Sequence, residues 1–418
     1  MDVRYLEIDS KKVKHKNWTI LVTSFLPGEL NIGFATASLS ALMYEISRDL
    51  SLTALQSGVV LSSLATSMAL FGIAAGTLAD SYGFARIFEL GMILTTFSSM
   101  LRAFVFDPWS LSILSLLTAA GVSLSVPPLT KMVSTLFKPE SQGLAIGTLA
   151  LGYRLGSASV LFLVPFLVSL VPSWRSVFLL YGGFGVIVTC VFYYFARTSS
   201  LKEMMHGDCN QDRPRMLANI GHVLNVKAVR IVAISRFFLS GFILSLSAFL
   251  PYLLRFTGTS MLLTGFLVGI FWVSQGAGCI LIPKLSDKIH KRAYLIIYLG
   301  ILSSLLVLLL IFSWESLVSR LTIIPILGFI FAGLTEIMWL IPLADPEVKS
   351  RYAGSSTGVL MSLGSIGGII SSIVIGYLLD ATSGVGPPLL FLAILSLLMA
   401  TAAFPARERK LNQENSHP

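Results

Sequence analysis

The chain alternates between long apolar runs and short polar segments. Each apolar run holds 18 to 28 residues, and a helix needs about 20 residues to cross the hydrocarbon core of a bilayer. The pattern therefore predicts an all-α integral membrane protein with twelve transmembrane helices. The predicted spans are Trp18–Met43, Thr53–Leu78, Arg86–Phe106, Trp109–Leu136, Gly143–Leu170, Val177–Ala196, Val229–Leu254, Ser260–Pro283, Ala293–Phe312, Val318–Leu343, Tyr352–Leu379 and Pro387–Phe404.

A polar segment at 197–228 divides the spans into two groups of six. The expected organisation is a terminal segment at 1–17, a first six-helix bundle at 18–196, a central loop at 197–228, a second bundle at 229–404 and a tail at 405–418. No polar segment is long enough for a separate catalytic domain. The nucleotide-binding pattern G-x-x-x-x-G-K-[ST] does not occur in the sequence. An enzyme or a primary pump is therefore not predicted.

Composition supports a protein that lies mostly inside a bilayer. Apolar residues make up 55% of the chain and charged residues 12%, against about 25% charged residues in a typical soluble domain. The three cysteines are far apart and show no ligand spacing. We therefore expect no disulfide framework, no metal site and no cofactor.

Lysine and arginine are distributed unevenly between the loops on the two sides. The side that carries both chain ends holds 21 of them, and the opposite side holds five: Arg48, Arg102, Arg175, Arg255 and Arg320. Because basic loops stay inside the cell, both termini are expected in the cytoplasm of a multi-pass cell-membrane protein. The net charge of +9 then reflects topology and contact with anionic lipid, and nucleic-acid binding is not expected.

Two features recur at the same separation along the chain. Asp80 follows the second span and Asp287 the eighth, 207 positions apart. The pairs Pro139-Glu140 and Pro346-Glu347 follow the fourth and tenth spans, again 207 positions apart. Matching loops at one offset indicate a duplicated six-helix unit, and repeated units of this kind build many secondary transporters.

The segment "GTLADSYGFAR" resembles the loop motif G-x-L-x-D-x-x-G of the major facilitator superfamily. The twelve spans and the repeat extend the resemblance over nearly the whole chain. It implies two pseudo-symmetric six-helix bundles around a midplane site, with transport by alternating access. It also implies that Asp80 approaches the start of the eleventh helix and holds an inner gate shut. The gating residues expected from this motif and its repeat are Gly76, Asp80, Gly83, Arg86 and Asp287.

Five ionisable residues lie inside the spans, away from the span ends: Glu29, Lys131, Arg154, Arg236 and Glu336. In the family that the chain resembles, the helices that carry them line the central cavity or the interface between the bundles. Charges inside a membrane protein usually face a wet cavity or a partner. Glu29 and Arg154 are each about eleven residues into their span, so about 16 Å deep. The other three are about 8–10 Å from the inner face at the same rise.

Three basic and two acidic groups favour an anionic substrate, with Arg154 as its bidentate anchor. Glu29 would carry a coupled proton, which makes a proton-coupled symporter of a small organic anion the main hypothesis. We expect a monomer whose partners are that solute, protons and the lipid bilayer. Alternatives left open are a drug or metabolite efflux antiporter and a non-transporting receptor. A permanent Glu29–Arg154 pair and a gate pair of Lys131 with Glu336 are also open.

Glycines recur four residues apart in the fifth and eleventh spans. They form the pairs Gly143/Gly147, Gly152/Gly156, Gly354/Gly358 and Gly364/Gly368. Small residues at this spacing let helix backbones approach closely. The sequence therefore predicts seams along which the two bundles slide past each other.

Overall fold

The computed structural model describes residues 17–137, 139–171, 173–198, 225–289, 292–343 and 353–404. Within these ranges, twelve helices are long and apolar enough to cross a membrane, which confirms the predicted all-α membrane architecture. The first half contains η1 (Leu21–Phe25, a π-helical turn), α2 (Leu26–Asp49), α3 (Ala54–Leu61), α4 (Ser63–Tyr82), α5 (Phe84–Leu101), η2 (Arg102–Phe104), α6 (Pro108–Leu136), α7 (Pro139–Leu170) and α8 (Trp174–Thr198). The second half contains α11 (Lys227–Phe256), α12 (Met261–Ile289), α13 (Arg292–Phe312), α14 (Leu317–Leu343), α15 (Ala353–Thr382) and α16 (Gly386–Ala403).

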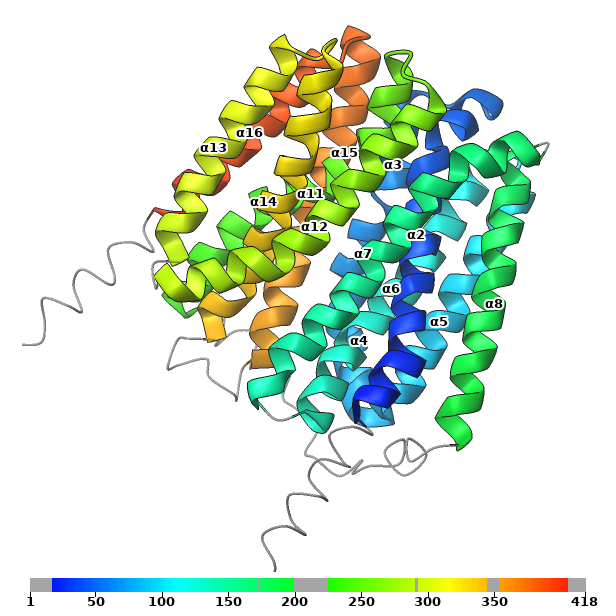
Figure 1. Cartoon of the computed structure of the whole chain (residues 1–418), viewed down its shortest axis with the longest axis vertical. Helices are drawn as coiled ribbons and strands as arrows, with labels where there is room; N and C mark the ends of the chain where they lie inside the picture. The colour runs from blue at the N-terminus through cyan, green and yellow to red at the C-terminus, as the bar shows by residue number, and fades with distance from the viewer. Residues whose placement is uncertain are drawn as a thin grey trace, which may run out of the picture.

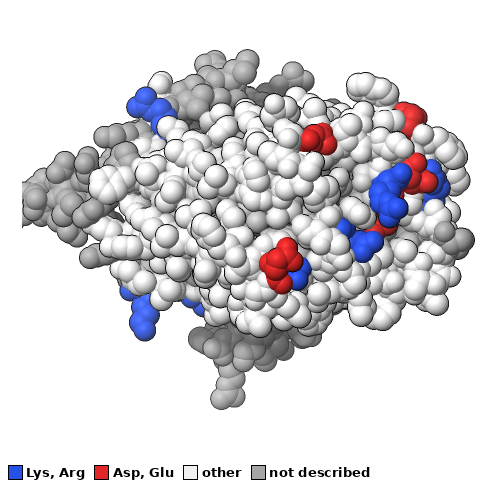
Figure 2. Space-filling view, turned by 90° about the horizontal axis from the view of Figure 1, so that it is seen from above, with Lys and Arg blue, Asp and Glu red and all other residues white. Residues whose placement is uncertain are grey.

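The two halves stand side by side as helical bundles (Figure 1). They meet where α7 packs on α12, where α3 and α4 pack on α15, and where α2 packs on α11. We call the end of the molecule at which α2 begins and α8 ends the proximal end. The opposite end, where α2 ends and α3 begins, is the distal end. Seen from the distal end, the acidic and basic side chains of the described residues occur singly or in small groups among uncharged ones (Figure 2).

Besides the eighth span, which continues as α12 to Ile289 instead of ending at Pro283, two spans differ clearly from the prediction. The first continues to Asp49 instead of ending at Met43, because its last polar turn is not in a loop but against the second half: Glu45 pairs with Arg255 of α11 at 3.1 Å. The second span is divided at Ser62 into α3 and α4. Neither difference changes the number of crossings.

Local chemistry explains where distal helices begin. Thr53 and Gln56 form a reciprocal capping box at the start of α3. Asp107 accepts hydrogen bonds from the backbone of Trp109 and Ser110 at the start of α6. Hydrogen bonds from Ser110 also hold the pKa of the Asp107 carboxyl below its usual range. These caps fix the two turns that join α2 to α3 and η2 to α6.

The halves are joined at the distal end by polar contacts. Asp380 of α15 accepts hydrogen bonds from the backbone nitrogens of Ala54 and Leu55, at 2.8 and 2.7 Å. This places a carboxylate on the positive end of α3. Ser40 of α2 donates to the carbonyl of Ala248 in α11 at 2.7 Å. Together with the Glu45–Arg255 pair, these contacts hold the two halves together at the distal end.

The glycine seams lie mostly inside each half, so the predicted sliding surface is wrong for α7. Gly152 and Gly156 pack against Leu26 and Leu30 of α2 in the same half. Gly364 approaches α11 of its own half, and only Gly368 also meets a residue of the first half, Ala65. A Cβ at Gly147 would meet nothing within 4 Å, and Gly143, Gly354 and Gly358 lie outside the part described in atomic detail. The glycines therefore bring cavity-lining helices of the same half close together: α7 to α2, and α15 to α11.

The gating motif is only partly described. Gly83 has a φ of 88° and separates α4 from α5, as a tight turn at this motif requires. Arg86 is exposed in the first turn of α5. The surroundings of Gly76, Asp80 and Asp287 lie outside the described part of the structure. The contact of Asp80 with the eleventh transmembrane helix stays a prediction.

Candidate functional site

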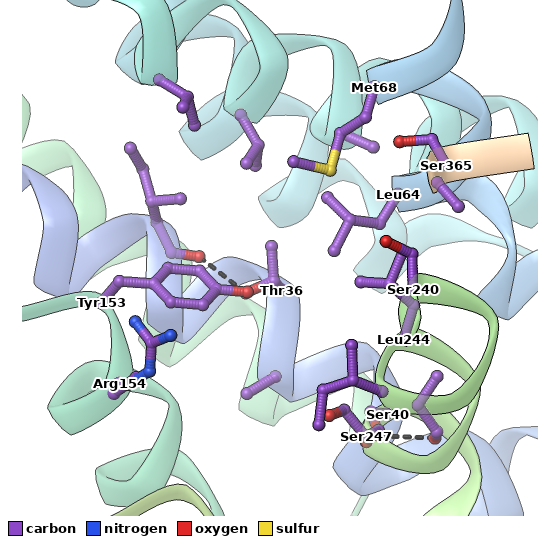
Figure 3. A pocket seen from close by; sticks show the side chains of 18 of the residues that line it. Thr36, Ser40, Leu64, Met68, Tyr153, Arg154, Ser240, Leu244, Ser247 and Ser365 are labelled. Atoms are coloured by element: carbon purple, nitrogen blue, oxygen red, sulfur yellow. Dashed lines mark hydrogen bonds between the residues drawn. The ribbon is translucent and has the colours of Figure 1, made fainter. Parts of the chain in front are cut away.

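A cavity of about 360 Å³ lies between the two halves. Its lining comes from α2, α3, α4, η2, α6 and α7 of the first half and from α11, α12, α14 and α15 of the second. Ser40, Ser247 and Ala248 line it, and Ser40 there belongs to the distal contacts. Figure 3 shows Tyr153 and Arg154 of α7 on one side, facing Leu64 and Met68 of α4.

Arg154 connects the two halves at the cavity. Its Nη2 lies 3.6 Å from Oε1 of Glu336 in α14. Its Nη1 donates to the carbonyl of Ala150, 3.3 Å away. Nε is buried and has no hydrogen-bond partner among the described residues. A guanidinium with one long ion pair and a free Nε retains donors for a bound anion.

Arg236 approaches the same carboxylate from the second half. Its Nη1 donates to the carbonyl of Thr335, the residue before Glu336, at 3.0 Å. The guanidinium carbon lies 3.9 Å from the ring centroid of Trp339, so the group stacks on the indole. Nε is again buried without a partner in the described chain. Arg154 and Arg236 thus approach one segment of α14 from opposite halves.

Glu29 occupies the position in the first half that corresponds to Arg236 in the second half, 207 residues later. It is 7% exposed, and its Oε1 is buried with no hydrogen-bond partner among the described residues. A Cβ at Gly152 would lie 3.3 Å from the Cβ of Glu29, so α7 packs directly beside this carboxylate. The π-helical turn η1 ends at Phe25, two residues before Pro27, and such turns are frequent at functional sites.

Charge in the cavity is unbalanced. Its acidic and basic lining residues, within the described ranges, are Glu29, Arg102, Arg154, Arg236 and Glu336. With all five ionised, the lining carries a charge of +1. No cluster of three potential metal-ligating side chains occurs within the described residues. The site therefore suits an anion held by arginines.

The family model of the Major Facilitator Superfamily matches residues 26–372. The chain belongs to the Major Facilitator Superfamily. It is therefore a transporter-family membrane protein and not an enzyme.

Named relatives within the superfamily cover nearly the same length. The hexuronate transporter of Bacillus subtilis is 24% identical over 87% of this chain and 88% of its own. The gallate transporter of Pseudomonas putida is 23% identical over 92% of this chain and 90% of its own. A solved structure of a bacterial homologue of the human lysosomal transporter Spinster, described as inward-facing and unoccupied, has a TM-score of 0.69. It is 16% identical and covers 93% of this chain and 94% of its own, so it shows the shared fold.

Four of the five predicted site residues line the cavity of this superfamily member. The fifth, Lys131, is half-buried in α6 and is not among the lining residues of this cavity, so its role stays a prediction. Glu336 pairs with Arg154 across the two halves, and the gate pair of Lys131 with Glu336 stays an open alternative. Glu29, for its part, forms no ion pair with Arg154 in the structure. The permanent Glu29–Arg154 pair is therefore not observed.

Two lining residues were missed from the sequence. Arg102, counted there among the loop arginines, is 2% exposed and donates to the carbonyl of Ala35 at 3.0 Å. Arg102 lies four residues before the predicted end of the third span, and this position inside the span could have indicated that its side chain is buried. Gln275 of α12 is 4% exposed, and its Nε2 lacks a partner in the described structure. An uncharged glutamine in an apolar span gave no comparable signal.

Proposed function

We propose that this protein moves a small organic anion across the membrane by alternating access, coupled to a proton. The observation that carries the proposal is the pair Arg154 and Arg236, which extend from different halves into one cavity with buried, unpartnered Nε atoms. A carboxylate between them would accept charge-assisted hydrogen bonds from both halves. Binding would then favour the state in which the halves are drawn together, as alternating access requires.

The names of the relatives support an anionic substrate. A hexuronate and a gallate each carry one carboxylate on a six-membered ring. The charge of +1 on the cavity lining suits such a ligand. Glu29 is the proposed proton carrier, because it lines the cavity and its Oε1 is buried without a hydrogen-bond partner in the described chain.

Counterflow in proteoliposomes tests the proposal. Vesicles loaded with unlabelled D-glucuronate, gallate or benzoate are diluted into the same labelled acid, with protein-free vesicles as the control for leakage. A carrier of organic anions should give a transient internal excess of label for at least one acid. Binding without counterflow would identify a receptor instead, and exchange of neutral or cationic compounds alone would contradict an anion carrier.

The proposed orientation places the proximal end in the cytoplasm. Reporter fusions after Thr198 and at the C-terminal tail should report a cytoplasmic location, and a fusion at Asp107 should report the outside. The reason is the excess of basic residues in the loops of the side that carries the termini. An outside signal at Thr198 would contradict this orientation. In the proposed orientation, the distal contacts hold the two halves together on the outer side of the cavity.

A further inference from the structure

The cavity has two walls of different chemistry, one at each contact between the halves. At the α7–α12 contact, Arg154 and Gln275 line it, with Glu336 of α14 beside them. The α4–α15 contact presents an apolar wall. Its apolar residues are Leu61, Leu64, Ala65, Met68 and Met361, and Ser63 and Ser365 of the same helices also line the cavity.

The repeat shows how this asymmetry arises. The position in the second half that corresponds to Arg154 is Met361, 207 residues later. Met361 lines the cavity, and its Sδ would lie 3.4 Å from a Cβ at Gly72 of α4. The pseudo-symmetric site therefore has a guanidinium on one side and a thioether on the other. Such a site accommodates one negatively charged end of a ligand.

Several hydroxyl groups on the lining already donate within the protein. Ser365 donates to the carbonyl of Met361 at 2.7 Å. Thr118 donates to the carbonyl of Leu114 at 2.8 Å, and Ser40 donates to that of Ala248. A ligand covered with hydroxyl groups would lose its hydrogen bonds to water on entry and find few replacements at the apolar wall.

Aromatic side chains flank the charged wall. Trp272 of α12 and Tyr153 of α7 both line the cavity and contact each other edge to face, with ring centroids 5.8 Å apart. Trp339, under the guanidinium of Arg236, is a third lining ring. These rings and the apolar wall offer surfaces against which a flat or cyclic hydrocarbon body packs.

We infer that the substrate is a small monocarboxylate with an apolar ring as its body, and not a polyhydroxylated sugar acid. The carboxylate faces Arg154 and Arg236, and the ring lies against Leu64, Met68 and Met361. This inference rests on the proposed function and narrows its substrate class. It separates two kinds of acid that the same arginines would otherwise accept.

A matched ligand series tests the inference on the full-length protein in lipid nanodiscs. Benzoate, cyclohexanecarboxylate and D-glucuronate all carry one carboxylate on a six-membered ring. Only the ring of D-glucuronate carries hydroxyl groups. Thermal unfolding is followed at increasing concentrations of each acid, because a ligand that binds the folded state raises the midpoint. Benzoate and cyclohexanecarboxylate should stabilise the protein at concentrations at least about tenfold lower than D-glucuronate.

The outcomes separate this inference from the proposed function. Equal or stronger stabilisation by D-glucuronate would overturn the apolar-ring inference and leave an organic-anion transporter intact. Benzamide and cyclohexanecarboxamide keep the ring and lack the charge. Stabilisation by these amides as strong as by the acids would overturn the anion function as well. No stabilisation by any of the three acids would also overturn both.

Two leucine variants on α4 locate the ring. Leu64 lines the cavity, whereas Leu70 is 62% exposed on the outer surface. Leu64→Ala should raise the concentration of cyclohexanecarboxylate needed for half-maximal stabilisation about five- to tenfold, because the ring loses apolar contact. The matched Leu70→Ala should change it less than twofold. Equal effects of the two substitutions would contradict the placement of the ring at the apolar wall.

Discussion

The Glu29→Gln protein is expected to exchange substrate across the membrane and to fail to accumulate it under an imposed proton gradient. Glutamine keeps the shape of the side chain and cannot release a proton. Counterflow needs no net proton movement, so it should persist at a rate within severalfold of the wild-type rate. Proton-driven uptake should fall to the level of protein-free vesicles. Both rates are measured on the same proteoliposomes.

Glu315→Gln is the matched control for this change. Glu315 is exposed between α13 and α14 and is absent from the cavity lining. Its substitution should leave both counterflow and accumulation at wild-type levels. Accumulation by Glu29→Gln protein against a substrate gradient would show that Glu29 is not the proton carrier. Its carboxylate would then bind substrate directly or serve packing beside Gly152.

Arg154→Lys should weaken substrate binding about 10- to 100-fold. A hydrogen bond to a charged group contributes about 1.5–3 kcal/mol, and each 1.4 kcal/mol corresponds to about tenfold in affinity. Lysine keeps the charge but cannot offer the planar, two-pronged donor of a guanidinium. The measurement is the half-saturation concentration in counterflow. The same substitution also removes the geometry of the Arg154–Glu336 pair.

Arg230→Lys is the control for an arginine-to-lysine change in the same protein. Arg230 is exposed on α11 and does not line the cavity, so binding should stay within about twofold of wild type. Thermal unfolding without ligand shows whether each variant is folded. A folded Arg154→Lys protein with unchanged half-saturation would refute the role of Arg154 as anion anchor. Arg236 would then be the main anchor.

The sequence predicted the crossings well because hydrophobic length is a local property. A run such as Val229–Leu254 must span a bilayer whatever its neighbours are, since its backbone hydrogen bonds are made within the helix. Helix ends were less accurate where a polar turn is covered by another helix. Glu45 read as the start of a loop, and in the structure it is paired with Arg255, 210 positions away.

The candidate site was predicted in part for a related reason. A charge in an apolar run is costly and therefore marks a functional position. Glu29, Arg154, Arg236 and Glu336 could be identified in this way without knowledge of the fold. Lys131 satisfied the same criterion and does not line the cavity, because depth along a helix does not specify which face the side chain occupies. Gln275 carries no charge, so this criterion could not identify it.

The sequence by itself determined the membrane-spanning architecture, the twofold repeat and four of the charged residues at the site, because these depend on residue type and spacing along the chain. Only the tertiary structure decided that Arg154 pairs with Glu336 across the two halves. It also showed that Arg102 is buried and that an apolar wall at α4 and α15 faces the arginines. Which side chains pair, and which surfaces face each other across the cavity, depends on how the helices are rotated and packed against one another. That packing is set by contacts between residues far apart in the chain, such as Gly156 against Leu30.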